Sequence, residues 1–172
     1  RKLYLCKEAV ELAMAVHRSP VVLCQRRAAR AARRAAGKRR QRARLEAGVR
    51  EVLAIAPDAT EVEAESCAWP YAEKGSDKAL AETRTMAARL LGFADAVAPF
   101  LAASGRPPEA VQRALALAHA PPQPEHGWRL SYACTGPGSI ISPQHTLRDG
   151  AAQLLSAVGC ETRLSDVPAL FE

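Results

Sequence analysis

The residues with the most distinctive chemistry are basic side chains crowded into one 19-residue segment, in which no acidic residue occurs. The ten basic residues of this segment are Arg26, Arg27, Arg30, Arg33, Arg34, Lys38, Arg39, Arg40, Arg42 and Arg44. Most are arginines, whose planar guanidinium holds two phosphate oxygens at once. Because like charges at this density repel one another, we expect a polyanion to lie against the segment.

The rest of the chain is mildly acidic. The whole sequence has 24 Lys and Arg, 18 Asp and Glu, and a formal net charge of +6. Ten of the basic residues lie in the basic segment, so 14 basic and 18 acidic residues remain elsewhere, a net charge of −4. The positive character of the protein is therefore confined to residues 26–44.

The composition of the basic segment favours RNA as the polyanion. As a helix, its 19 residues would extend over about 27 Å and reach several phosphates. Base-specific contacts usually also use Asn and Gln, and the segment has only Gln41. It has no zinc-finger spacing, and the leucine pattern after it stops at Pro57, too early for a coiled-coil dimer. We expect all ten basic residues to contact the phosphates of a structured RNA without reading its sequence.

An anionic membrane or an acidic protein surface is the alternative partner. A helix that lies on a membrane normally carries Trp, Phe or Leu on its apolar side, whereas residues 26–44 offer only alanine there. The alternative function is thus a peripheral structural subunit of a membrane-bound energy-converting complex. No run of 18 uncharged apolar residues occurs, so we expect no transmembrane segment.

The remaining reactive side chains form no recognisable constellation. Five cysteines (Cys6, Cys24, Cys67, Cys134 and Cys160) are scattered without a C-x-x-C pair, which favours reduced thiols in an intracellular compartment. The four histidines have no metal-ligand spacing, and the turn at residues 136–139 lacks the lysine of a phosphate-binding loop. We therefore expect no enzymatic activity, metal, cofactor or small-molecule substrate.

The elements that position the basic segment are predicted to be helices. The sequence has 36 alanines among 172 residues and only 5% aromatic residues. A core with so much alanine removes little apolar surface from water, and strands favour β-branched and aromatic residues instead. The composition predicts a mainly α protein.

A long basic helix is predicted over residues 20–56, after a first helix over residues 2–18. Ser19 and Pro20 are typical of a helix start, and Pro57 ends the helix. On a helical wheel the side opposite most of the arginines is lined by alanines, namely Ala28, Ala32, Ala35, Ala36, Ala43 and Ala47. Alanine allows close approach but supplies little hydrophobic stabilisation, so we expect a partner to order this helix.

Further helices are predicted as far as residue 120. A capping box at Thr60 and Glu63 opens a short acidic helix that ends near Ala68. Residues 69–71 (Trp-Pro-Tyr) are predicted to form a rigid bend with packed aromatic rings. A helical hairpin is predicted over residues 77–119, with the first helix kinked at Pro99.

The composition changes after Ala120, where a Pro-rich stretch predicts a stiff linker. Apolar residues alternate with others from Trp128 to Cys134, which predicts a strand, and a short helix is predicted from Leu147 to Val158. We expect a helical body over residues 1–120 and a small, irregular α+β appendage over residues 121–172.

These patterns predict a structural RNA-binding protein. The function expected is that of an accessory subunit of an organellar ribosome, with the long helix neutralising rRNA phosphates and the remainder contacting neighbouring proteins of the assembly. The compartment expected is the mitochondrial matrix, or alternatively the plastid stroma.

Overall fold

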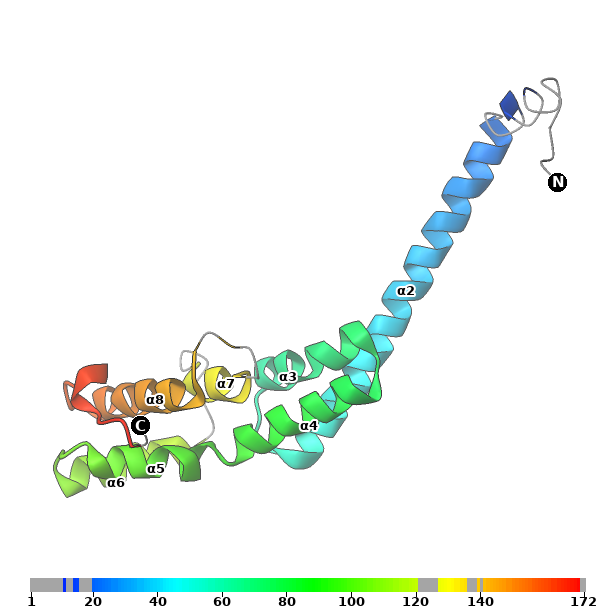
Figure 1. The fold of residues 1–172 in the computed structure, drawn as a ribbon. Coiled ribbons are helices and arrows are strands. Elements are labelled where there is room, and N and C mark those ends of the chain that lie inside the picture. Colours follow the sequence, from blue (N-terminus) through cyan, green and yellow to red (C-terminus); the bar gives the residue numbers. More distant parts are fainter. Residues whose placement is uncertain are drawn as a thin grey trace, which may run out of the picture. The chain divides into compact units, whose positions relative to one another are not determined.

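The chain is mainly α-helical, as the composition predicts. The computed structural model describes residues 20–120, 127–135, 139 and 141–170, together with Glu11, Met14 and Ala15. From residue 20 onward its elements are α2 (Pro20–Ile55), α3 (Glu61–Lys74), α4 (Asp77–Leu91), α5 (Phe93–Ala103), α6 (Pro108–His119), α7 (Trp128–Ala133), α8 (Pro143–Ala157) and the 3-10 helix η1 (Leu164–Asp166) (Figure 1). No strand occurs among the described residues. The predicted helix over residues 2–18 and the linker at 121–124 lie outside them, apart from the three residues named above.

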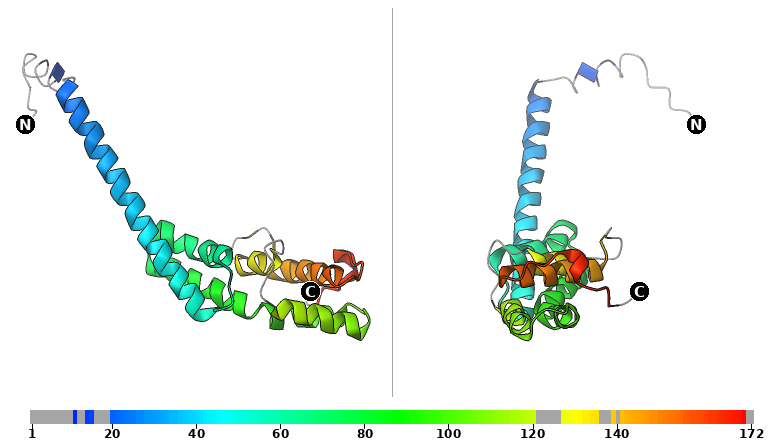
Figure 2. Two further views of the ribbon diagram at one scale, coloured as in Figure 1. Left: turned by 180° about the vertical axis from the view of Figure 1, so that it is seen from behind. Right: turned by 90° about the vertical axis from the view of Figure 1, so that its left-hand side faces the viewer.

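The chain divides into two compact units, residues 1–42 and residues 43–172. The sequence analysis predicts a boundary between two parts near residue 120. In the second unit, α7 packs against α4 and α5, and α8 packs against α5 and α6, so the helices after residue 120 share their contacts with those before it (Figure 2).

The predicted long helix is confirmed as α2, which runs without a break from Pro20 to Ile55. In its first half the described side chains from Leu23 to Ala35 are all exposed. Alanine and arginine are strong helix formers, so this half depends on intrinsic propensity. In its second half Gly48 and Val52 are buried, and packing adds to propensity there.

Small residues let α2 approach α3 closely. A Cβ atom at Gly48 would lie 2.9 Å from the Cβ of Ala68, a distance at which one of the two would have to shift. This contact borders a cluster that we call the alanine cluster. Its buried residues come from α2, α3, α4 and α7 and from the residue after α2, and they are Val52, Ala56, Ala64, Cys67, Ala87, Leu90 and Ala133.

A second core, the aromatic cluster, joins α5, α6, α7 and α8. Its largest members are Phe93, Phe100 and Trp128. Gly150 of α8 brings that helix close to α5, because a Cβ atom there would lie 3.3 Å from the Cζ of Phe93. The Arg148 guanidinium donates hydrogen bonds of 2.9 and 2.7 Å to the carbonyl oxygen of Val167 and so holds the segment after η1 against α8.

The first helix of the predicted hairpin is broken at Gly92, where the sequence analysis predicts one continuous helix. The axes of α4 and α5 differ by 47° across this break, while Pro99 lies exposed within α5. The break lets neighbouring apolar residues enter different cores, because Leu90 belongs to the alanine cluster and Phe93 to the aromatic cluster. The hairpin proper is therefore α5 and α6.

The acidic helix starts as predicted but is longer. Thr60 and Glu63 form the predicted capping box at the start of α3. The helix continues through Pro70 to Lys74 and ends at Gly75, whose φ of 62° gives the left-handed cap that favours glycine. The prediction of a bend with packed aromatic rings is wrong, because Trp69 lies within the helix and is 51% exposed.

The predicted strand from Trp128 to Cys134 is wrong, and with it the α+β appendage. Residues 128–133 form α7, in which Trp128, Arg129 and Ala133 are buried. Their spacing places Arg129 and Ala133 on one side of a helix, whereas alternation would have turned Arg129 toward water. The last helix begins at Pro143, capped by Ser142, and ends at Ala157, so it starts four residues before the predicted Leu147.

Replacing Gly48 with alanine is expected to lower the free energy of unfolding by about 1–3 kcal/mol, because the added methyl overlaps Ala68 at the crossing of α2 and α3. Urea denaturation followed by circular dichroism measures this change.

Gly37 provides the matched control in the same helix. Nothing lies within 4 Å of a Cβ atom built there. Gly37→Ala is therefore expected to raise the free energy of unfolding by about 1 kcal/mol, the usual difference in helix propensity between glycine and alanine. A gain in stability for both variants would contradict the close contact at Gly48.

Candidate nucleic-acid interface

All ten predicted RNA-binding residues lie on α2, and nine of them are exposed. The exposed nine, which we call the basic surface, are Arg26, Arg27, Arg30, Arg33, Arg34, Lys38, Arg39, Arg40 and Arg42. The helix holds them over a rise of about 24 Å, at 1.5 Å per residue. This length is enough for contacts with several successive phosphates.

Arg44, the tenth predicted residue, is placed differently. It is half-buried, and its guanidinium lies against Gly75 at the C-terminal end of α3. A cation is favoured at this end of a helix, where the backbone carbonyls carry partial negative charge. Any side chain at position 75 would overlap the guanidinium. This close contact favours glycine at position 75, in addition to the positive φ of the residue. Arg44 therefore has a structural contact with the end of α3.

The basic surface extends around the helix and is not confined to one side. At 100° per residue, Arg30 and Arg34 lie on one side of α2, while Arg39 and Arg42 lie among the alanines of the opposite side. Short alanine side chains between the arginines leave the helix thin, so anionic groups can approach it closely. Such a helix suits a crevice lined with phosphates on more than one side.

The two units carry opposite charge. Residues 1–42 contain 13 basic and 2 acidic residues, a net charge of +11, whereas residues 43–172 contain 11 basic and 16 acidic residues, a net charge of −5. A polyanion is thus attracted by the first unit and repelled on average by the second. The charge pattern favours contact through the first half of α2.

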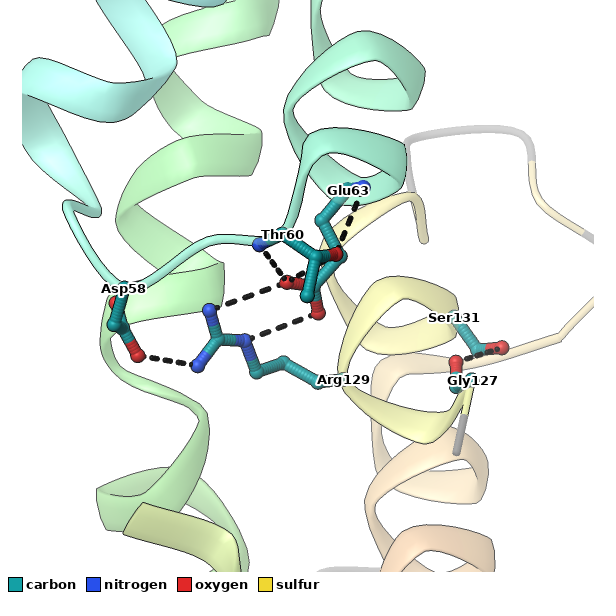
Figure 3. A network of polar contacts seen from close by, with 6 residues as sticks. All are labelled: Asp58, Thr60, Glu63, Gly127, Arg129 and Ser131. Atoms are coloured by element: carbon teal, nitrogen blue, oxygen red, sulfur yellow. Dashed lines mark hydrogen bonds and ion pairs between the residues drawn. The ribbon is translucent and has the colours of Figure 1, made fainter. Parts of the chain in front are cut away.

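A second polar constellation, which the sequence analysis does not identify, surrounds Arg129 of α7 (Figure 3). The Arg129 side chain is only 5% exposed, and one of its terminal nitrogens lies 2.6 Å from a carboxylate oxygen of Asp58. Its Nε lies 3.2 Å from Oε1 of Glu63, and its other terminal nitrogen lies 3.3 Å from Oε2. Glu63 also accepts a 2.9 Å hydrogen bond from the backbone N–H of Thr60.

This constellation, the Arg129 network, stabilises the fold and offers no site for an anion. Two carboxylates already surround the guanidinium, so its charge is compensated within the protein. The network joins α7 to the start of α3 and to the loop before it. The cue in the sequence is an arginine between Trp128 and Leu130, but only the fold supplies its acidic partners.

Comparisons with known proteins identify no relative, so the function has to be inferred from the geometry. The sequence matches no protein-family model, and neither the curated proteins nor the solved structures include a significant match. Within the described residues, no single helix has both the length and the apolar character needed to cross a bilayer.

Replacing Arg129 with methionine is expected to lower the free energy of unfolding by about 3–5 kcal/mol, because Glu63 is left as a buried charge without its partner. Thermal and urea denaturation measure this loss. The double variant Arg129→Met, Glu63→Gln removes both charges and is expected to recover part of it.

The surface ion pair between Arg84 and Glu51 provides the control. It has a similar nitrogen–oxygen distance of 2.9 Å, but its side chains are 54% and 40% exposed. Arg84→Met is expected to leave the denaturation midpoint nearly unchanged, since water screens such pairs. Equal losses for Arg84→Met and Arg129→Met would contradict a special role of the buried network.

Proposed function

We propose that this protein is a structural RNA-binding protein whose basic surface contacts the phosphates of a folded RNA. The observation that carries this proposal is a continuous helix with nine exposed basic residues and no acidic residue between them. Surface helices normally balance their charges with acidic residues three or four positions away, and within residues 26–44 there are none, although Glu46 stands four positions after Arg42. An external polyanion can supply the counter-charge.

The side chains between the arginines favour RNA over a lipid surface. From residue 26 to residue 44 the apolar side chains are all alanines, most of them exposed. Alanine contributes little free energy on entering the acyl region of a membrane, where a surface helix relies on larger apolar residues. Phosphate contacts need no apolar anchor, so the composition fits the groove or crevice of a folded RNA.

We further propose that the RNA is ribosomal and that the protein is an accessory subunit of an organellar ribosome, in the mitochondrial matrix or alternatively the plastid stroma. The acidic unit, residues 43–172, would then contact neighbouring proteins of the assembly. The exposed Val62 and Trp69 on α3, which are 68% and 51% exposed, offer one apolar surface for such a contact.

The variant with Arg30, Arg34 and Arg40 replaced by glutamate is expected to bind structured RNA about 10–100-fold more weakly at physiological salt. The slope of log affinity against log salt concentration is expected to become less steep by about 2–3, near 0.9 for each phosphate that the protein no longer neutralises. Fluorescence anisotropy with a labelled RNA hairpin at several salt concentrations measures both quantities. Arg44 is left unchanged because it contacts Gly75.

The matched control carries the same charge change on residues 43–172. Replacing Arg50, Lys78 and Arg113, all exposed, by glutamate is expected to leave the salt slope unaltered. Equal weakening by the two triple variants would contradict a specific basic surface. Binding to anionic vesicles, with none to RNA, would instead support the membrane alternative.

The native protein is expected to sediment with a large particle on a density gradient. Ribonuclease treatment is expected to return it to the top of the gradient, because RNA is the proposed binding partner. Release by detergent and not by ribonuclease would contradict the ribosomal proposal, as would a small free species before any treatment.

A further inference from the structure

Two cysteines that are far apart in the sequence lie together in the second unit. Cys67 is on α3 and belongs to the alanine cluster, as does Ala133 at the end of α7. Cys134 is the next residue, and its backbone N–H donates a 2.9 Å hydrogen bond to the carbonyl of Leu130, which ends α7. The fold therefore brings the two cysteines together beside this cluster, close enough for the thiol of Cys67 to interact with the sulfur of Cys134.

The two thiols differ in exposure and in acidity. Cys67 is fully buried, whereas Cys134 is exposed. The hydrogen bond from Cys67 lowers the pKa of Cys134 to about 7, against the opposing effect of partial burial. The same hydrogen bond raises the pKa of Cys67, and burial raises it further. Near neutral pH, Cys134 is therefore about half thiolate, the form that attacks sulfur, while Cys67 keeps its proton.

We propose that Cys67 and Cys134 form a reversible disulfide, with the exposed Cys134 as the attacking thiol, the buried Cys67 as the resolving thiol, and a low-molecular-weight disulfide such as oxidised glutathione as the oxidant. This inference concerns residues 43–172 and does not depend on the proposed RNA binding.

The reaction takes place in two exchange steps. The Cys134 thiolate attacks one sulfur of oxidised glutathione, which forms a mixed disulfide and releases one glutathione thiolate that takes a proton from water. Cys67 then loses its proton to solvent and attacks the Cys134 sulfur, which releases the second glutathione. Two protein thiols are oxidised to one disulfide, and one oxidised glutathione is reduced to two thiols. Excess reduced glutathione reverses both steps.

The fold limits the distance over which the second step must act. The Arg129 network joins α7 to the start of α3 and so keeps Cys134, which directly follows α7, near α3. The thiolate of Cys67 that must form during resolution is disfavoured by the charge of Glu63 and favoured by the charge of Arg129, and the effect of Glu63 is the larger. The bond would close a long loop, which restricts the unfolded chain.

Treating the full-length protein with oxidised glutathione is expected to lower its mass by two hydrogens and to yield a peptide that links Cys67 to Cys134. The midpoint of thermal unfolding is expected to rise by about 5–10 °C, and reduced glutathione is expected to restore the starting value. Intact mass spectrometry, peptide mapping and thermal denaturation measure these changes. A peptide map in which other cysteine pairs are linked equally often would overturn the proposal.

Two variants separate the roles of the thiols. Cys67→Ala is expected to accumulate a stable mixed disulfide at Cys134, because no resolving thiol remains, whereas Cys134→Ser is expected to give no modification at Cys67. Cys24, exposed on α2, serves as the internal control in the same peptide map. Disappearance of the mixed disulfide from Cys134 in Cys67→Ala as fast as in the unaltered protein would contradict resolution by Cys67. Since Cys134 is exposed, Cys134→Ser tests the proposal even if Cys67→Ala folds poorly.

The pH dependence of alkylation at Cys134 provides a further readout. It would be the same in Cys67→Ala if the two cysteines were only packed together. The rate of iodoacetamide reaction at Cys134 is expected to be half-maximal at about pH 7. In Cys67→Ala the hydrogen bond that stabilises the thiolate is gone, so the midpoint is expected to move up toward the ordinary cysteine value of about 8.5. An unchanged midpoint in this variant would overturn the assignment of Cys67 as the donor.

Discussion

The buried pair between Arg129 and Glu63 is the interaction on which the organisation of residues 43–172 depends. Removing these charges from water is unfavourable unless each stays paired, so the pair is compatible only with structures that keep α7 against the start of α3. Glu63 also completes the capping box of α3, which links the helix start to the same pair. Asp58 extends the link to the loop after α2. A single buried guanidinium thus joins α7 to the start of α3 and to the loop before it, which lie 66 and 71 residues earlier in the chain.

The alanine content explains why such a link is needed. Alanine side chains bury little apolar surface, so helix contacts such as Gly48 on Ala68 gain from close approach and dispersion more than from area. Contacts of this kind are individually weak and similar to one another along a helix. The larger side chains of the aromatic cluster and the Arg129 network distinguish one alignment of the helices from its neighbours.

The same composition has the opposite consequence in the first half of α2. There the exposed alanines bury nothing, and the arginines between them are exposed to solvent, where an anion can reach them. The protein therefore separates two kinds of chemistry: phosphate binding, which we propose for the basic surface, and thiol exchange, which we propose beside the Arg129 network. The first depends on charge density along one helix. The second depends on the contact between α3 and α7.

Local patterns were sufficient for the elements that depend on neighbouring residues. The proline boundaries and high propensity of α2, the capping box of Thr60 and Glu63, and the mainly α class all follow from residues close together in the sequence, because backbone propensity and capping are local. The tertiary structure alone decided the break at Gly92, the helical state of Trp128–Ala133, the contact of Arg44 with Gly75 and the meeting of Cys67 with Cys134. In each of these, the outcome depends on a group distant in the chain. Arg129 alternates with apolar neighbours like a strand residue, and only the buried carboxylate of Glu63 makes its burial in a helix favourable.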